Sequence, residues 1–180
     1  AQTDGAAAAV LTRADLAKSF RPDPAWVKAV TVIAGPNPQK DPGNDFLSWK
    51  PTAWAAADAY RQAGIDDPRR QLQVAQVHDC FTLTELLSYE DLGFCAKGAA
   101  KEHIASGAFA LGGELPVNTD GGLKTFGHPT GATGVRMIYE NVLQLRGQAG
   151  PRQVPDVRLA LSHNIGGHPT ACGIAILGNE

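Results

Sequence analysis

The sequence predicts an α/β fold in which a mixed sheet of five strands is layered with helices. Runs of β-branched or small apolar residues alternate with helical patterns, which is typical of parallel strands joined by crossover helices. The last two strand-like runs are separated by a short glycine-bearing turn, and this predicts an antiparallel pair. With 180 residues, of which 43% are hydrophobic, the chain can bury one sizeable core. The predicted order of elements is β-α-β-α-β-α-β-β.

The first two predicted strands flank a short helix. Residues 5–11 form a small-residue run that ends in Val and Leu, and we interpret it as a buried strand, although alanine-rich runs also form helices. Thr12 is a typical N-cap for a helix over residues 13–20. Residues 27–35 alternate and are rich in β-branched side chains, so they predict the second strand.

The later elements follow from the same patterns. Gly64 ends one helical pattern, and Pro129 suits the first turn of another, whose apolar residues recur at three- to four-residue spacing as far as Leu145. His168 and Pro169 are expected to shape the final turn. The other predicted elements are helices at 49–63, 83–92 and 99–106 and strands at 72–77, 157–162 and 171–177.

Composition excludes several classes of protein. A net charge of −2, from 16 basic and 18 acidic residues, gives no polycationic face for nucleic acid. The three cysteines, Cys80, Cys95 and Cys172, lack CxxC spacing and are odd in number, which favours neither a zinc site nor a disulfide framework and fits a reducing, cytoplasmic location. No apolar run reaches the ~20 residues of a membrane span. The chain begins without Met, and we expect a fragment or a processed chain.

The glycine-rich stretch NTDGGLKTFGHPTGATG, residues 118–134, is the strongest functional signal. It places His128 between Gly127 and Pro129, immediately before a helical pattern, and its glycines allow the backbone to approach a ligand closely. At a helix N-terminus the helix dipole favours a neutral imidazole, the state that a proton acceptor needs. The alternative is a turn histidine that only caps the helix.

Two other segments place chemically capable residues where a strand meets a loop. HDCF supplies His78 and Cys80, and HNIGG supplies His163 and Asn164. Metal binding is disfavoured, because no carboxylate or thiol follows these histidines at helical ligand spacing. GxSxG, P-loop and dinucleotide-binding patterns are missing from the sequence, so a Cys/His arrangement remains.

The order of HDCF, NTDGGLKTFGHPTGATG and HNIGG resembles the thiolase superfamily, most closely the sterol-carrier-type thiolases and their bacterial and archaeal relatives. The pattern GGLxxxGHPxGATG is highly specific. TDGAAAAVL resembles the last strand of the thiolase amino-terminal half, so the resemblance assigns residues 1–20 to the end of that half and 27–180 to the carboxyl-terminal domain. It also implies that the acyl-accepting cysteine and most of the loop domain that grips coenzyme A lie outside this sequence.

The resemblance implies a role for each matching catalytic position. His128 would activate the nucleophilic cysteine and hold the thioester oxygen, and His78 would help to form the same oxyanion site. Cys80 would be the acid/base thiol, and the amide of Gly166 would contribute to a second oxyanion hole. Asn164 stands where classical thiolases carry the second catalytic cysteine, in CxGGG. The resemblance therefore implies that Cys80 takes the acid/base role or that this role is lost. A Claisen reaction needs such a base, proton shuttle and oxyanion donors.

The resemblance also implies a substrate and partners. Coenzyme A would enter as a thioester substrate rather than a covalent cofactor, with Gly127, Phe81 and His163 as expected contacts. The expected partner is a thiolase amino-terminal half, from the same precursor or a separate chain, in a homo- or hetero-oligomer.

Two other functions and several structural roles stay open. A thiolase-like retro-aldolase acting on a β-hydroxyacyl-CoA with a small OB-fold partner would share these motifs, and some such aldolases use tyrosines; for Tyr89 and Tyr139 here we favour packing. A non-catalytic scaffold or acyl-binding subunit is the third function. Cys80 could also be a half-buried core thiol, whereas Cys95 and Cys172 are expected to be structural.

Overall fold

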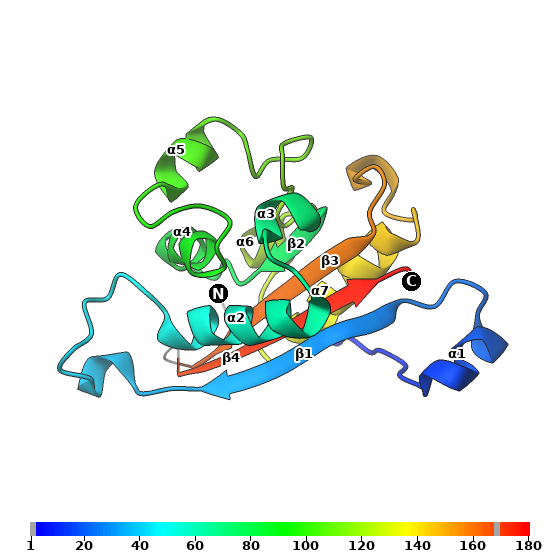
Figure 1. Cartoon of the computed structure of the whole chain (residues 1–180), viewed down its shortest axis with the longest axis horizontal. Helices are drawn as coiled ribbons and strands as arrows, with labels where there is room; N and C mark the ends of the chain where they lie inside the picture. The colour runs from blue at the N-terminus through cyan, green and yellow to red at the C-terminus, as the bar shows by residue number, and fades with distance from the viewer. Residues whose placement is uncertain (1–2, 168–169) are drawn as a thin grey trace.

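The computed structural model describes residues 3–167 and 170–180, and these form a four-stranded mixed sheet with helices on both faces (Figure 1). The turn assigned to His168 and Pro169 lies outside the described residues. The strands are β1 (Trp26–Ala34), β2 (Val74–Val77), β3 (Leu159–Gly166) and β4 (Ala171–Gly178). The helices are α1 (Ala14–Phe20), α2 (Lys50–Ala63), α3 (Pro68–Gln71), α4 (Thr82–Asp91), α5 (Ala100–Ala105), α6 (Gly122–Phe126) and α7 (Thr133–Leu145), with 3₁₀ turns η1 (Pro38–Lys40) and η2 (Gly150–Arg152).

The strand order β1-β4-β3-β2 confirms the predicted mixed sheet. β4 runs antiparallel to both β1 and β3, as the short glycine-bearing turn predicts, while β2 and β3 are parallel. In the β2–β3 register Val77 lies opposite His163, so His78 and Asn164 come next on the two strands. The sheet therefore brings two of the predicted functional segments to one edge.

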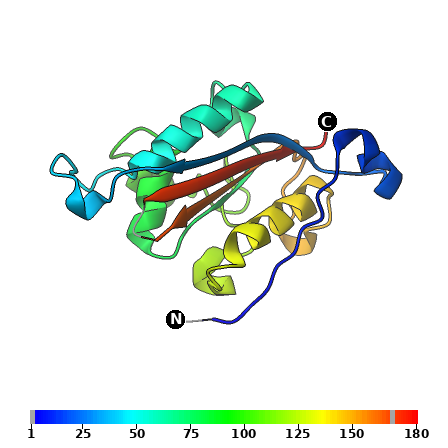
Figure 2. The same ribbon diagram turned by 90° about the horizontal axis from the view of Figure 1, so that it is seen from below.

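The predicted strand at residues 5–11 is wrong, and the sheet has four strands rather than five. In the described part of the chain no strand runs beside this segment, so its backbone groups have no ladder partner. It passes α7 and reaches α1 on the outside of the molecule (Figure 2). Thr12 does not cap α1 either, because the N-cap position is Arg13. On the far side of β2, a single parallel bridge joins Ala75 to Val117.

Helices cover the two faces of the sheet unequally. α2 packs over β1 and β4 on one face, and Gly64 ends this helix in the left-handed conformation, as predicted. α7 packs on the other face over β3 and β2. Beside α7, that face stays uncovered at β1, where Val30 and Val32 are 60% and 77% exposed. We call this region the open sheet face.

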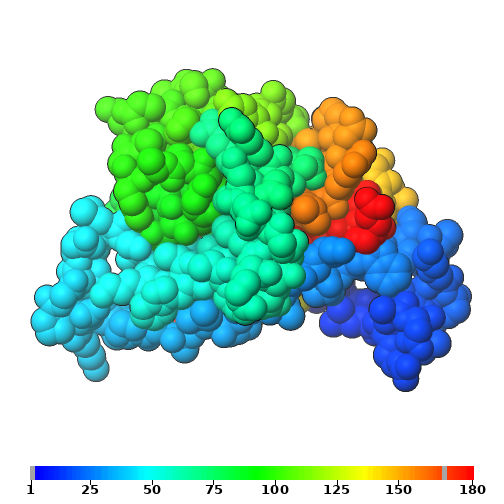
Figure 3. Space-filling model, viewed as in Figure 1, coloured from blue at the N-terminus to red at the C-terminus, as the bar shows by residue number. Residues whose placement is uncertain are grey.

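The molecule is elongated along the sheet. α1 and the loop between β1 and α2 project at opposite ends, as the space-filling view shows (Figure 3). The main core lies between the sheet and the helices α2 and α4. A smaller core lies between the sheet and α7. Within the described ranges, no helix is long and apolar enough to cross a membrane.

Candidate functional site

The carboxyl end of β2 and the neighbouring part of β3 bring together His78, His128 and Asn164, as the sequence predicts. The ring centroids of His78 and His128 lie 5.0 Å apart, with the rings perpendicular. Nδ1 of His78 lies 2.7 Å from Oδ1 of Asn164, whose amide therefore fixes the orientation of the His78 ring. Three segments that are distant in sequence thus supply one compact cluster.

The hydrogen bonds of His128 define which ring nitrogen is free. Its Nδ1 lies 2.7 Å from the hydroxyl oxygen of Thr133, and that hydroxyl donates to the carbonyl of Pro129 at 3.1 Å. The arrangement that satisfies both contacts has the Thr133 hydroxyl donating to Pro129 and accepting from Nδ1–H of His128. The lone pair of the neutral ring is then on Nε2, where a base needs it.

The position of His128 relative to the helix differs from the prediction. α7 begins at Thr133, after a turn in which the N–H of Ala132 donates to the carbonyl of Pro129 at 2.8 Å. His128 is therefore joined to the helix start through the Thr133 hydroxyl rather than placed on it. The short helix α6, which the sequence analysis did not anticipate, ends at Gly127, whose φ of +99° favours glycine.

Burial keeps the His78 ring neutral. The side chain is buried, which lowers its pKa, and the nearby His128 ring lowers it further, while the bond with Asn164 acts in the opposite direction. A neutral His78 avoids the repulsion that two cationic rings would have at this distance.

His163 is not placed for the predicted contact with coenzyme A. The side chain is fully buried, and its Nδ1 accepts from the backbone N–H of His78 at 3.5 Å. Its Nε2 lies 3.0 Å from the hydroxyl of Thr52 on α2. Burial lowers the pKa of His163 to about 3, so the ring stays neutral. The His163 ring therefore contacts the backbone of His78 instead of lining a ligand site.

Cys80 lies beside the cluster but is not activated in this state. Its sulfur is half-buried and lies 4.0 Å from the hydroxyl of Thr84, and burial raises the pKa of the thiol. Burial also raises the pKa of Cys95 to about 11 and that of Cys172 to about 12, which fits structural roles for both.

The remaining predicted residues are exposed or half-buried. Phe81 is exposed at the start of α4, Gly166 is exposed at the end of β3, and Gly127 is half-buried. Their backbone and ring surfaces are open to a ligand. Among the residues that the structure describes, no group of three His, Cys, Asp or Glu side chains could hold a metal ion.

Sequence reasoning missed three residues that hold the site. Thr133 fixes His128, and Thr3 accepts from the N–H of His128 at 3.3 Å. Asp79, between two predicted site residues, holds the backbone of α6. The hydroxyl five residues after His128 was a usable signal for Thr133, whereas the long-range contacts of Thr3 and Asp79 leave no local pattern.

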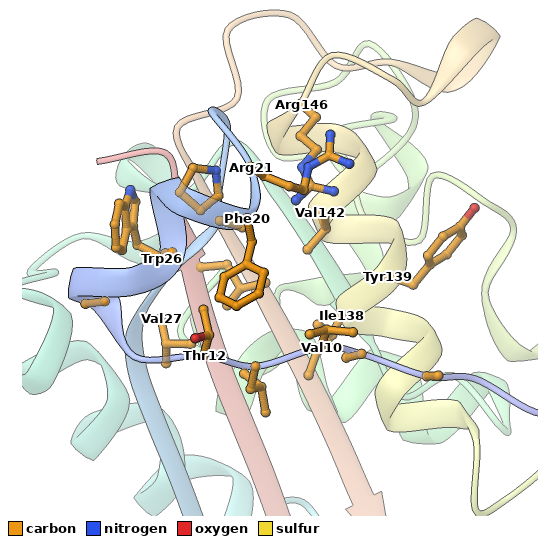
Figure 4. A pocket seen from close by; sticks show the side chains of 18 residues that line it. Val10, Thr12, Phe20, Arg21, Trp26, Val27, Ile138, Tyr139, Val142 and Arg146 are labelled. Atoms are coloured by element: carbon orange, nitrogen blue, oxygen red, sulfur yellow. The ribbon is translucent and has the colours of Figure 1, made fainter.

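A large groove lies away from the histidines. It encloses about 700 Å³ between residues 8–12, α1, β1 and α7 (Figure 4). Its wall is mainly apolar and includes Val10, Phe20, Val27, Ile138 and Val142. We call this region the α1–α7 groove. It contains none of the predicted site residues, so volume alone does not identify the functional site.

Comparisons with known proteins agree on one family. The family "Thiolase C-terminal domain-like" matches residues 40–179. Acetyl-CoA acetyltransferase of Methanothermobacter thermautotrophicus is 40% identical over 92% of this chain and 42% of its own length, and sterol carrier protein 2 of Oryctolagus cuniculus is 36% identical over 91% and 30%. The solved "Ltp2-ChsH2(DUF35) aldolase" superposes with a TM-score of 0.74 at 29% identity, covering 87% of this chain and 40% of that one. The chain thus spans less than half the length of each of these proteins.

Proposed function

Because this chain belongs to the thiolase family as a carboxyl-terminal domain, we propose that it is the base-bearing half of a sterol-carrier-type thiolase. The enzyme would be an acyltransferase that makes or cleaves 3-oxoacyl-CoA thioesters, with a coenzyme A thioester as substrate and no covalent cofactor. The observation that carries this proposal is the His128 ring, whose Nδ1 is committed to Thr133 and which lies edge-on to His78. Residues 27–180 are the catalytic domain in this proposal, and residues 1–20 end the other half.

In the synthetic direction, the proposed first step transfers an acyl group from a coenzyme A thioester to a cysteine outside this chain. Nε2 of His128 accepts the thiol proton, and the thiolate attacks the thioester carbonyl carbon. The carbon–sulfur bond of the thioester breaks, and coenzyme A leaves as a thiolate that takes up a proton. The protonated His128, together with His78, stabilises the oxyanion that forms between these events.

The proposed second step uses the other predicted residues. In the cleavage direction the thiolate attacks the 3-oxo carbonyl carbon instead, the carbon–carbon bond breaks, and Cys80 donates a proton to the acyl-CoA enolate that leaves. In synthesis Cys80 removes that proton from the second acyl-CoA. The raised pKa of Cys80 means a protonated thiol near neutral pH, which supports the donor role. Asn164 orients His78 and has no acid/base function, while the amide of Gly166 faces the second oxyanion. Gly127 and Phe81 flank the thioester.

Two apolar surfaces support a requirement for the amino-terminal half. The open sheet face exposes Val30 and Val32, and the α1–α7 groove is walled by apolar side chains. We propose that the amino-terminal half, in the same precursor or as a separate chain, covers these surfaces and supplies the nucleophile, within a homo- or hetero-oligomer. The free cysteines fit the reducing cytoplasm, where we place the protein.

A retro-aldolase is the second candidate, because of the similarity to the "Ltp2-ChsH2(DUF35) aldolase". In that case the substrate would be a β-hydroxyacyl-CoA and the partner a small OB-fold protein. Tyr89 is a poor proton donor for this reaction, because it is buried against Phe109 and hydrogen-bonded to Glu85. Tyr139 on α7 is exposed and remains available in the aldolase interpretation.

The test of the proposed function compares this chain with and without its amino-terminal half. Alone, the chain is expected to show no thiolysis of acetoacetyl-CoA or longer 3-oxoacyl-CoA, because it provides a base but no acyl-accepting cysteine of the family type. Co-expression with the amino-terminal half should restore thiolysis, measured as loss of the 3-oxoacyl-CoA absorbance. Activity of the isolated chain would contradict the shared-site proposal.

The same assembled enzyme separates the three candidate functions. Cleavage of β-hydroxyacyl-CoA without thiolysis would favour the aldolase, and binding of acyl-CoA without turnover would favour a scaffold or acyl-binding subunit. Either result would overturn the thiolase proposal.

The Thr133 hydroxyl gives a second expected result. Thr133→Val keeps the shape of the side chain but removes the acceptor of Nδ1–H of His128, so the ring loses its fixed tautomer and orientation. One hydrogen bond of about 1 to 1.5 kcal/mol corresponds to roughly a tenfold loss in kcat. Thr133→Ser retains the hydroxyl and should keep near-full kcat in the assembled enzyme. Equal losses in both variants would show that the hydroxyl does not hold His128.

A further inference from the structure

Asp79 separates His78 from Cys80 in the chain but takes part in a different contact. Its side chain is buried, and Oδ1 accepts from the N–H of Leu123 at 2.6 Å, across 44 residues of sequence. Leu123 is the second residue of α6, and the N-cap residue of that helix, Gly121, has no side chain to offer. A carboxylate from the β2–α4 loop therefore caps the N–H of Leu123, beside Asp120, whose Oδ1 accepts from the N–H of Gly122 at 3.2 Å.

The backbone of α6 is shaped to admit this carboxylate. Gly122 has a φ of +63°, and a Cβ at this position would lie 2.3 Å from Oδ2 of Asp79. Any side chain at residue 122 would force the carboxylate away. Gly122 in the glycine-rich stretch thus makes room for a carboxylate within the protein, at a position where the sequence suggested close approach to a ligand.

α6 transmits this contact to His128. It spans five residues and ends at Gly127, directly before His128. At its far end the Phe126 ring lies under the guanidinium of Arg136, at 5.0 Å, and Arg136 pairs with Asp120 and donates to Gln76 at 3.3 Å. The helix α6, which connects the Asp79 contact to His128, is therefore short and held at both ends.

The groups around Asp79 shift its pKa in both directions. Burial raises its pKa and Glu85 on α4 raises it further, whereas the backbone N–H of Leu123 and the Lys124 ammonium lower it. Arg136 on α7 adds a favourable positive charge. Without the amides of α6 the buried carboxylate would lose its hydrogen-bond donor, so the contact constrains α6 as much as Asp79.

We propose that Asp79 is a positioning residue that locks α6, and through it sets the edge-on placement of His128 against His78. Its importance for turnover rests on the proposed thiolase function, but the placement itself is a property of this chain. Asp79 touches neither ring; it acts through the backbone of residues 122–127.

The test is NMR of the complex with the amino-terminal half, in which this chain is labelled with ¹³C-histidine and its five histidines are assigned by single substitutions. The wild-type chain should give a through-space cross-peak between the rings of His78 and His128. Asp79→Ala is expected to abolish that cross-peak, while Asp79→Asn, whose amide oxygen can still accept from Leu123, should restore part of it. Loss of thermal stability alone would not produce this pattern.

Asp91→Asn is the matched control. Asp91 is also a buried carboxylate that holds a loop, accepting from the N–H of Trp49 at 2.6 Å and from Ser48 at 2.7 Å. This variant should lower the melting temperature yet leave the histidine cross-peak intact. Retention of the cross-peak in Asp79→Ala, or its loss in Asp91→Asn as well, would overturn the proposal.

Gly122→Ala disrupts the same contact by changing α6 instead of Asp79. It replaces Asp79→Ala as the test if that variant does not fold. The added Cβ should displace the carboxylate and abolish the cross-peak as Asp79→Ala does, and a retained cross-peak would overturn the proposal. In the assembled enzyme Asp79→Asn should lower kcat with little change in KM. If Asp79→Ala or Gly122→Ala loses the cross-peak but neither the wild-type enzyme nor any variant shows thiolase activity, the proposed function is rejected and the positioning role is supported.

Discussion

His128→Ala is expected to lower kcat by a factor on the order of 10³ or more in the enzyme assembled from both halves. The substitution removes the base that activates the nucleophile and, once that base is protonated, a donor to the thioester oxyanion. General bases and oxyanion donors each contribute about 10²-fold or more. KM should change much less, because the ring acts mainly on the reacting atoms. Steady-state thiolysis of a 3-oxoacyl-CoA measures both quantities.

The control for this result is His103→Ala. His103 lies on α5 and contacts Arg69 and the Phe109 ring, apart from the paired histidines. This variant should keep near-wild-type kcat. If His128→Ala retained more than about a tenth of the wild-type kcat, the proposed base would have to be another group.

Cys80→Ser is expected to stop the reaction at a later step. Serine keeps a hydrogen-bonding side chain but is far too weak an acid to exchange a proton with an enolate near neutral pH. In the synthetic direction, acyl transfer from an acyl-CoA to the nucleophilic cysteine does not need Cys80 and should continue. An acyl-enzyme should therefore accumulate, with turnover falling by a factor on the order of 10² or more.

Intact-mass analysis of the amino-terminal half measures this accumulation directly. Wild-type enzyme mixed with substrate should show little added acyl mass at steady state, whereas Cys80→Ser should show nearly full acylation. Near-full turnover of Cys80→Ser beside an inactive His128→Ala would instead mean that Cys80 only packs. The proton shuttle would then lie at His78 or in the amino-terminal half.

Sequence reasoning brought two candidate residues together because both were expected to follow neighbouring parallel strands. His78 does follow β2, whereas Asn164 lies inside β3. Residues after neighbouring parallel strands meet at one edge of a sheet, and this rule placed His78 beside Asn164. The same logic shows why His163 was misassigned. Successive side chains of a strand point to opposite faces, so when Asn164 faces His78, His163 must face α2 and Thr52. That alternation was available in the sequence and was not applied.

The other misses came from contacts that local patterns do not encode. An apolar run such as residues 5–11 signals burial, but a strand exists only beside another strand, and the described chain offers none there. α6 is too short and too rich in glycine to show helical periodicity. Leu123 in this helix donates to Asp79, 44 residues away, and no spacing rule detects such a contact.

The exposed edge of β1 bears on how this chain behaves in solution. β1 pairs only with β4 in the described structure, and along its free side the N–H of Val30 is covered by the Gln62 side chain at 3.2 Å. The other edge groups, next to exposed Val30 and Val32, form a template for pairing with further chains. Expressed without a partner, the chain should therefore be prone to aggregation, which a lysine at position 32 would reduce.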